Sequence, residues 1–304
     1  MKRFLRHTVI FVFPIILLAI SFEVMLRKIP NDYAFKKDHL DQHSREIEIL
    51  FLGNSHVFFG IDPKYINRKS FNAAYISQSL NFDLAILKKY EGRWDKLKCI
   101  VLPIDYFSLY STLESGIESW RVKNYRIYYD IQLTHDFVEN IELFTSSLTV
   151  TISRLYTYYC LHMPVSISSF TGWGNTNKST ISQDLETGGK IAADRHTAAN
   201  QSFVPANLET VRSIIEFAKT KNIQVLFFTS PAYKSYIENL DRDQLNNTIH
   251  YASVLAASYN NARYINLLND RDFLIGDFFD ADHLNEIGTK KLTLKIHQLI
   301  KQGY

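Results

Sequence analysis

The sequence predicts an α/β protein built on a parallel sheet with helices on both faces. Short apolar runs alternate along the chain with longer segments of helical periodicity, which is the order expected when helices connect parallel strands. The apolar runs are continuous, as in strands that are covered on both faces. The chain has 304 residues, 46% of them hydrophobic, which is enough for one large core and an insertion. We therefore expect one sheet domain over residues 46–304.

The strand pattern occurs five times. The first segment contains Ile49-Leu50-Phe51-Leu52 and leads into Gly53, and the third ends at Pro103. Proline and glycine commonly end a strand because they favour turns. The expected strands are residues 46–52, 70–72, 100–102, 225–228 and 263–267.

Helical spacing separates these strands. In one segment Leu208, Val211, Ile215 and Ala218 recur at intervals of three or four residues, which places them on one helix face. The expected helices are residues 77–90, 207–221, 241–259 and 287–300. Residues at about 106–205 break the alternation, because they are rich in tyrosine and include a polar stretch at 172–182. We expect an insertion there, with helices first and then a long loop or lid.

The amino terminus carries an apolar segment that begins at Thr8 and is closed by Arg27 and Lys28. A membrane-spanning helix needs about 20 mostly apolar residues, and positive charge ahead of it favours a cytoplasmic amino terminus. We therefore expect a single-pass anchor over residues 1–28, a stem over 29–45 and an extracytoplasmic main domain. A signal peptide cleaved near Ala19-Ile20-Ser21 is an alternative that also exports the domain. A membrane-surface or buried helix is the remaining interpretation.

Charge and cysteine content exclude several other classes. The net charge is only +3 and no basic stripe with interleaved aromatic residues occurs, so we expect no nucleic-acid partner. Two cysteines, Cys99 and Cys160, make no disulfide framework, although one disulfide between them stays open. No cysteine–histidine cluster with metal-ligand spacing is present. We expect neither a metal nor a cofactor.

Two segments at opposite ends of the chain carry residues suited to nucleophilic catalysis. Ser55 follows the first strand, and His283 lies three residues after Asp280. A serine hydroxyl is a weak nucleophile that needs an adjacent base, itself oriented by a third group. Ligands of parallel sheets bind at the carboxyl ends of the strands, where these segments would meet. Ser55 is the predicted nucleophile, His283 the base and Asp280 the orienting carboxylate.

Each of these residues also has a structural interpretation. Ser55 could simply end a strand, and Asp280 or Asp282 could cap the last helix. Asp282 is also a rival for the orienting role, although an adjacent side chain usually points elsewhere. His56 is more readily an orienting or substrate-side group than the base.

Acyl transfer also needs hydrogen-bond donors for the developing oxyanion. The Ser55 backbone N–H is one candidate, Asn72 is another, and Ala74 and Ser77 could offer backbone N–H groups. Asp105 could donate only if it were protonated. Asn72 could instead form a turn and Asp105 could cap a helix. Arg195 and His196 could reach the site from the insertion or could be polar surface residues.

These motifs resemble those of the SGNH (GDSL-like) hydrolase superfamily. The resemblance rests on Gly53-Asn54-Ser55, Asn72 and Asp280-x-x-His283, and it covers residues of about 46–105 and 205–300. It implies a three-layer, flavodoxin-like fold and a Ser–His–Asp triad without metal. Two departures accompany it. Ala74 or Ser77 stands where the family has an oxyanion-donating glycine, and Asp105 stands where it has an asparagine.

With its amino-terminal anchor, the chain looks like the exported branch of that superfamily, which includes the teichoic-acid D-alanine transfer and alginate acetylation proteins. The resemblance implies an esterase or O-acyltransferase that acts on acyl, foremost acetyl, esters of a cell-envelope polysaccharide. Its partners would be the membrane, the glycan substrate and a membrane-bound acyltransferase. One alternative is a weakly active or inactive scaffold that binds polymer or the acyltransferase. Another is a lipase or phospholipase at the membrane surface.

Overall fold

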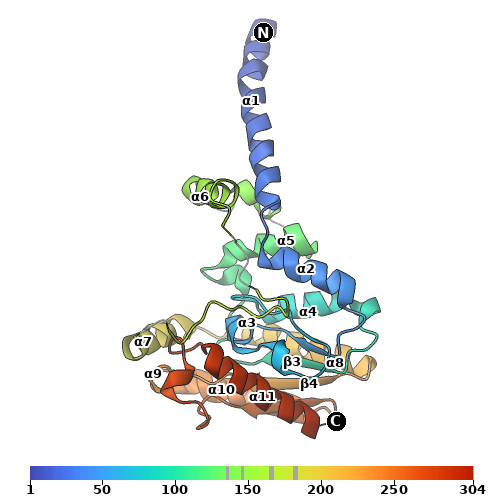
Figure 1. Ribbon diagram of the computed structural model, residues 1–304, viewed down its shortest axis with the longest axis vertical. Helices are drawn as coiled ribbons and strands as arrows, with labels where there is room; N and C mark the ends of the chain where they lie inside the picture. Colours follow the sequence, from blue (N-terminus) through green and yellow to red (C-terminus); the bar gives the residue numbers. More distant parts are fainter. Residues whose placement is uncertain (135–136, 145–146, 164–167, 181–183, 304) are drawn as a thin grey trace. The chain divides into compact units, whose positions relative to one another are not determined.

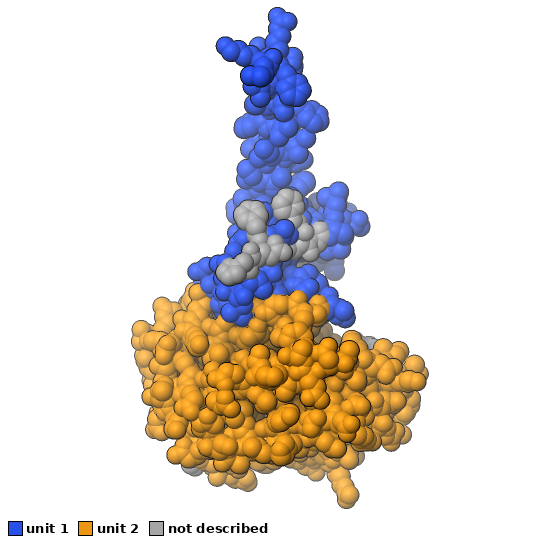
Figure 2. Space-filling view, turned by 180° about the vertical axis from the view of Figure 1, so that it is seen from behind, with its two compact units in different colours: residues 1–38, 117–166 blue, residues 39–116, 167–304 orange. Residues whose placement is uncertain are grey.

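A computed structural model describes residues 1–134, 137–144, 147–163, 168–180 and 184–303. The chain forms two compact units, which Figure 2 shows in different colours. One unit comprises Met1–Asp38 with Ile117–Ser166, and the other comprises His39–Gly116 with Ile167–Tyr304. Part of the polar stretch predicted as a loop or lid, residues 181–182, lies outside the described residues. The predicted boundaries of the anchor, stem and insertion stay predictions.

The larger unit contains the five-stranded parallel sheet. Its strand order is β2-β1-β3-β4-β5, which is the flavodoxin-like order 2-1-3-4-5. The predicted α/β fold class is therefore confirmed. The strands are β1 (Ile49–Phe51), β2 (Ser70–Asn72), β3 (Cys99–Pro103), β4 (Gln224–Thr229) and β5 (Ala262–Asn266).

Helices cover both faces of this sheet (Figure 1). On one face, Phe51 and Val101 share an apolar cluster with Leu292 and Ile296 of α11. The neighbouring strand residues point the other way, because side chains alternate along a strand, and they are fully buried too. The helices of this unit are α3 (Ser55–Gly60), α4 (Leu80–Lys89), α7 (Leu185–His196), α8 (Val204–Thr220), α9 (Lys234–Glu238), α10 (Arg242–Ala257) and α11 (Glu286–Gln302).

Side chains cap the first turns of α3, α7, α10 and α11. Asp241 accepts the backbone N–H of Gln244 at the start of α10, and Asn285 accepts those of Ile287 and Gly288 at the start of α11. Such caps satisfy backbone donors that have no partner within the helix. The expected and observed helix ends therefore agree within about three residues. Four short 3₁₀ turns complete the unit: Pro63–Tyr65, Glu91–Arg93, Leu113–Ser115 and Ile275–Asp277.

The smaller unit contains α1, the long amino-terminal helix. Among the described residues, α1 (Lys2–Arg27) is the one helix long and apolar enough to cross a membrane, a property that a signal sequence would share. The unit also contains α5 (Val122–Tyr129), α6 (Leu148–Tyr159) and 3₁₀ turns at Ser119–Arg121, Phe137–Asn140 and Glu142–Phe144. Helix α2 (Asp32–His43) leads from this unit into the larger one.

Glu23, which interrupts the apolar run of α1, has a structural role. Its carboxylate accepts the backbone N–H groups of Glu142 (3.1 Å) and Leu143 (3.0 Å) and pairs with Arg27. Two further cations, Lys123 at 2.7 Å and Arg154 at 3.0 Å, bind the buried Glu142 carboxylate. The last turn of α1 is thus fixed to residues that are more than 100 positions away.

Candidate active site

The turn after β1 requires glycine. Gly53 has a φ of +116°, and a Cβ at this position would lie only 2.3 Å from Pro103 Cδ. Only glycine tolerates that backbone conformation without strain. Its N–H donates to Asp83 Oδ1 at 2.8 Å, and Asn54 then caps α3 by accepting the N–H of His56. This turn places Ser55 as the first residue of α3.

Asp83 stabilises that turn through its hydrogen bond with the Gly53 N–H. Its side chain is buried on α4, and burial raises the pKa of the carboxyl to about 7. Gln78 also donates to the same oxygen at 2.5 Å. A buried carboxyl thus fixes the backbone immediately before Ser55.

A second turn carries the predicted base. Phe278 and Leu284 form an antiparallel bridge, and Asn285 donates to the Phe278 carbonyl at 3.2 Å. Within the turn, Asp280 Oδ1 accepts the backbone N–H groups of Asp282 (3.1 Å) and His283 (2.7 Å). These bonds fix Asp280 and His283 in one tight loop just before α11.

Ser55, His283 and Asp280 come together in a hydrogen-bonded row. His283 Nε2 lies 2.8 Å from Ser55 Oγ, and His283 Nδ1 lies 3.0 and 3.1 Å from the two Asp280 oxygens. When Nδ1 carries the proton and donates to Asp280, Nε2 is free to accept the Ser55 proton. The distances in this row match those expected between a serine, its base and an orienting carboxylate.

His56 occupies a buried position between two carboxylates. Its Nδ1 lies 2.9 Å from Asp105 Oδ2 and its Nε2 lies 3.5 Å from Asp282 Oδ2. Burial alone would lower the pKa of His56, but Asp105 and Asp282 raise it to about 9. His56 is therefore a positively charged imidazolium at neutral pH, and its ring centre is 5.0 Å from that of His283.

Asp282 contacts four cationic or imidazole side chains although it is 4% exposed. Besides His56, its oxygens lie 3.5 Å from His283 Nδ1, 3.7 Å from Arg195 Nη2 and 3.9 Å from His196 Nδ1. Burial raises the pKa of Asp282, yet the neighbouring histidines hold it well below its usual value. The carboxylate stays ionised at the centre of this cluster.

The pKa of the predicted base is also displaced. Burial lowers the pKa of His283, but Asp282 and Asp280 together raise it well above its usual value. The sequence predicts Asp282 only as a rival orienting group or helix cap and does not indicate its central position. The signal in the sequence was its place beside His283, since the tight turn brings both carboxylates to the same ring.

The predicted oxyanion donors need correction. Asn72 donates to the carbonyls of Val57 and Ile61, both at 2.8 Å, and its Oδ1 accepts the Ala74 N–H at 3.0 Å. The structure thus leaves neither the Asn72 amide nor the Ala74 N–H for a substrate. Both groups stabilise the turn after β2 instead.

Asp105 is likewise an acceptor and not a donor. Its oxygens accept hydrogen bonds from Asn54 Nδ2 (3.0 Å), His56 Nδ1 and the Ser230 N–H (2.8 Å). Burial raises the pKa of the carboxyl, but His56 and these bonds lower it overall. Asp105 is ionised and cannot donate to an oxyanion.

Ser55 keeps the other predicted donor. Throughout the chain segments that the structure describes, no acceptor lies within hydrogen-bond reach of the Ser55 backbone N–H. Ser77, the alternative, has a φ of +59°, which is uncommon for a residue with a side chain. The Ser55 N–H is therefore available to a substrate oxygen beside the nucleophile.

Arg195 and His196 reach the site from the end of α7. Arg195 is half exposed, whereas His196 is partly buried beside Phe107 and its Nδ1 lies 2.8 Å from Tyr236 Oη. Burial lowers the pKa of His196 to about 3, so this imidazole is neutral. Arg195 is the charged side chain of the pair that solvent or a substrate can reach.

Metal binding can be tested on the same cluster. His56, Asp282 and His283 are a group among the described residues whose ligand atoms lie within 4.8 Å of one another. However, His56 is held as an imidazolium between two carboxylates, and it would have to lose a proton before a metal could bind. The donor set fits protons better than a metal ion.

Comparison with known proteins gives no family assignment. No family model and no curated protein matches the chain. Among solved structures, a GDSL-like lipase from Bacteroides thetaiotaomicron shares 11% identity over 89% of this chain and 99% of its own, with a TM-score of 0.42. A proposed acylhydrolase from Bacteroides fragilis shares 11% identity over 87% of this chain and 95% of its own, with a TM-score of 0.42. A proposed platelet activating factor from Streptococcus pneumonia shares 12% identity over 97% of this chain and 99% of its own, again with a TM-score of 0.42. At such values we base no argument on these likenesses.

We predict that Gly53→Ala destabilises the larger unit by about 2–4 kcal/mol, because a methyl group strains the backbone and overlaps Pro103. Chemical denaturation of both proteins measures the difference. Gly188→Ala on α7, where a Cβ meets no atom within 4 Å, is the matched control and should be neutral or slightly stabilising. Equal stability of Gly53→Ala and the original chain would contradict the strained turn.

A second prediction concerns His56 and pH. Its pKa is about 9 in the folded protein against 6.5 for an ordinary histidine, so its stabilising effect is complete below pH 6.5 and is lost as pH rises through 9. The free energy of unfolding should therefore fall between these values, by at most about 1.4 kcal/mol per pH unit from this group. His56→Gln should remove that part of the slope. His250→Gln, on the exposed side of α10, should leave the pH dependence of the free energy of unfolding unchanged. Identical slopes in the original protein and both variants would refute a buried imidazolium at position 56.

Proposed function

We propose that this protein is a serine esterase or O-acyltransferase that forms an acyl-enzyme on Ser55. The observation that carries the proposal is the row Ser55–His283–Asp280, with 2.8 Å between Ser55 Oγ and His283 Nε2. That distance is within the range for proton transfer to a general base. The resemblance of the sequence motifs to SGNH hydrolases points to the same residues.

The proposed reaction begins when Ser55 Oγ attacks the carbonyl carbon of an acyl ester and passes its proton to His283 Nε2. Asp280 stabilises the resulting imidazolium through Nδ1, and the Ser55 N–H donates to the oxyanion. His283 then gives the proton to the departing alcohol, which leaves the acyl group on Ser55. Water or a sugar hydroxyl next attacks this ester, His283 takes the proton of the acceptor, and Ser55 recovers it.

We infer that Asp282 sets the pH range of this reaction. It lies 3.5 Å from His283 Nδ1, so it stabilises the protonated base more than the neutral one. A base with a raised pKa is a stronger proton acceptor but needs a higher pH to be unprotonated. Acylation should therefore be fastest under mildly alkaline conditions.

For the location and substrate, we propose a single-pass membrane protein whose main domain is extracytoplasmic and acts on acyl, foremost acetyl, esters of an envelope polysaccharide. The apolar α1 and the positive residues in its first turns support the location. The resemblance to exported SGNH proteins supports the substrate class and a membrane-bound acyltransferase as partner. Half-exposed Arg195 beside the cluster would suit a polar, oxygen-rich substrate.

One observation favours the scaffold alternative. Asn72, Ala74 and Asp105 all use their hydrogen-bonding groups within the protein, so the site has fewer oxyanion donors than the sequence predicted. Removing one oxyanion donor typically slows acyl transfer by about 10²–10³-fold. A chain with fewer donors could bind its polymer or partner while reacting slowly.

We predict that the full-length protein in nanodiscs hydrolyses p-nitrophenyl acetate and that Ser55→Ala lowers kcat/KM by about 10³-fold or more. Asp280→Asn should lower it by up to about 10⁴-fold, because His283 loses its orienting partner. Ser258→Ala, at an exposed helix end, is the control with unchanged activity. Intact-protein mass should show one acetyl group that depends on Ser55.

The outcomes of that assay separate the candidate functions. Folded protein with neither turnover nor an acetyl adduct would reject the enzyme and favour the scaffold. Turnover that increases with acyl chain length would instead favour a lipase, whereas a preference for acetyl supports polysaccharide deacetylation or transfer. A sugar acceptor that accelerates loss of the acetyl group from Ser55 would identify a transferase.

A further prediction follows for Asp282→Asn. Removing this carboxylate should lower the pKa of His283, so the acid limb of the pH profile of kcat/KM should move to lower pH by about one unit or more. Asp243→Asn, on the exposed first turn of α10, should leave the profile in place. A limb that stays fixed or moves to higher pH in Asp282→Asn would contradict the proposed role.

A further inference from the structure

Helix α6 of the smaller unit exposes an apolar stripe. Leu148, Ile152 and Tyr156 follow one another at intervals of four residues and are 66%, 52% and 56% exposed. This spacing puts them on one side of the helix. Thr151 and Leu155, which are buried, form the inner side. A row of exposed apolar side chains on a stable helix marks an interaction surface.

The inner side of α6 packs against the end of the candidate membrane helix. Leu155 shares an apolar cluster with Leu26 and Ile29, and Tyr159 Oη donates to the Met25 carbonyl at 3.0 Å. Figure 1 shows α6 beside the end of α1 that is remote from the amino terminus. The helix that carries the apolar stripe therefore contacts the last turns of α1 through its carboxyl-terminal half.

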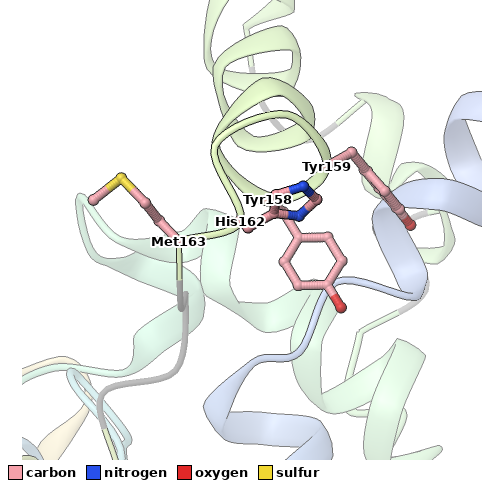
Figure 3. Close-up of a pocket in the computed structure, with 4 residues that line it drawn as sticks. All are labelled: Tyr158, Tyr159, His162 and Met163. Atoms are coloured by element: carbon pink, nitrogen blue, oxygen red, sulfur yellow. The ribbon is translucent and has the colours of Figure 1, made fainter.

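The composition of this segment fits a lipid surface. Residues 147–163 contain no Asp or Glu, and Arg154 is their one Lys or Arg; its guanidinium pairs with Glu142. Tyr156, Tyr158 and Tyr159 supply amphipathic rings of the kind enriched at membrane interfaces. Tyr158 and Tyr159, the last residues of α6, line an open cavity of about 430 Å³ with His162 and Met163 (Figure 3).

We propose that α6 is an interfacial helix that lies in the membrane surface beside the exit point of α1. Its stripe would enter the boundary between headgroups and acyl chains, to a depth of about 5–10 Å. The proposal rests on the membrane span assigned to α1 and is independent of the Ser55 chemistry. Continuity with α1 and the lack of carboxylates favour lipid over a second copy of this chain as the occupant.

Single-cysteine fluorescence in nanodiscs tests this placement. The full-length protein carries Cys160→Ser, which removes its exposed cysteine. An environment-sensitive dye is then attached to one introduced cysteine per variant. The four sites are Leu17→Cys in α1, Ile152→Cys on the stripe, Ser153→Cys beside the stripe and Val254→Cys on the exposed side of α10. The nanodiscs contain phosphatidylcholine and phosphatidylglycerol, with or without lipids that carry a quencher near the headgroup. We expect about twofold quenching at Ile152, less at Ser153 and none at Val254.

The probes distinguish failure of the span from failure of the interfacial helix. An unquenched probe at Leu17, with a quencher deep in the acyl region, rejects the span and the inference with it. Quenching at Leu17 but not at Ile152 rejects the interfacial helix alone. A probe at Ile152 that is shielded from water, unquenched by lipid and accompanied by a dimer would assign the stripe to a second copy and overturn the proposal.

Discussion

A buried positive charge organises the carboxyl edge of the sheet. The His56 imidazolium lies between Asp105, which follows β3, and Asp282, which precedes α11. Asp105 in turn accepts hydrogen bonds from Asn54 after β1 and from the Ser230 N–H after β4. Three strand ends and the last loop are thus joined through one ion cluster. A single buried charge left without its partner is costly, so the members of this cluster depend on one another.

The same cluster explains why the two segments of the proposed triad meet. Ser55 immediately precedes His56, and His283 immediately follows Asp282. The ion pair between His56 and Asp282 therefore holds Ser55 and His283 close to each other. The ion pair joins His56 Nε2 to Asp282 Oδ2, whereas the proposed triad uses Ser55 Oγ and the ring nitrogens of His283. The two interactions therefore use different atoms of residues that are adjacent in sequence. Substitutions at His56 or Asp282 should then affect both folding and chemistry.

Sequence analysis predicted the fold class and brought Ser55, Asp280 and His283 to one edge, because strand patterns and the rule for parallel sheets determine which chain ends meet. It did not predict which polar groups already form hydrogen bonds within the protein. Asn72 and Asp105 had the right residue types for substrate contacts, but their partners are backbone and side-chain groups that only the folded chain brings near. Asp282 was undervalued because the tight turn, rather than residue spacing, directs its carboxylate toward His283.

The tyrosine-rich segment was the hardest to predict, since it lacks a clear period. It contains a buried ion cluster at Glu142, whose partners Lys123 and Arg154 are separated from it by 19 and 12 positions. Pattern analysis over short windows cannot pair charges at such spacing. Residues Ile117–Ser166 lie in one compact unit with Met1–Asp38, and the predicted boundaries of the insertion stay a prediction.

The anchoring of α1 has a practical consequence for protein production. The last turn of this helix is part of a folded unit: Glu23 accepts two backbone N–H groups, and Leu26 and Ile29 are buried with Leu155. Truncation after Lys28, the obvious boundary of an apolar leader, would expose that cluster and leave two backbone donors without their acceptor. A soluble form designed for crystallisation should instead begin at Phe22 or earlier, so that only the exposed apolar turns are removed.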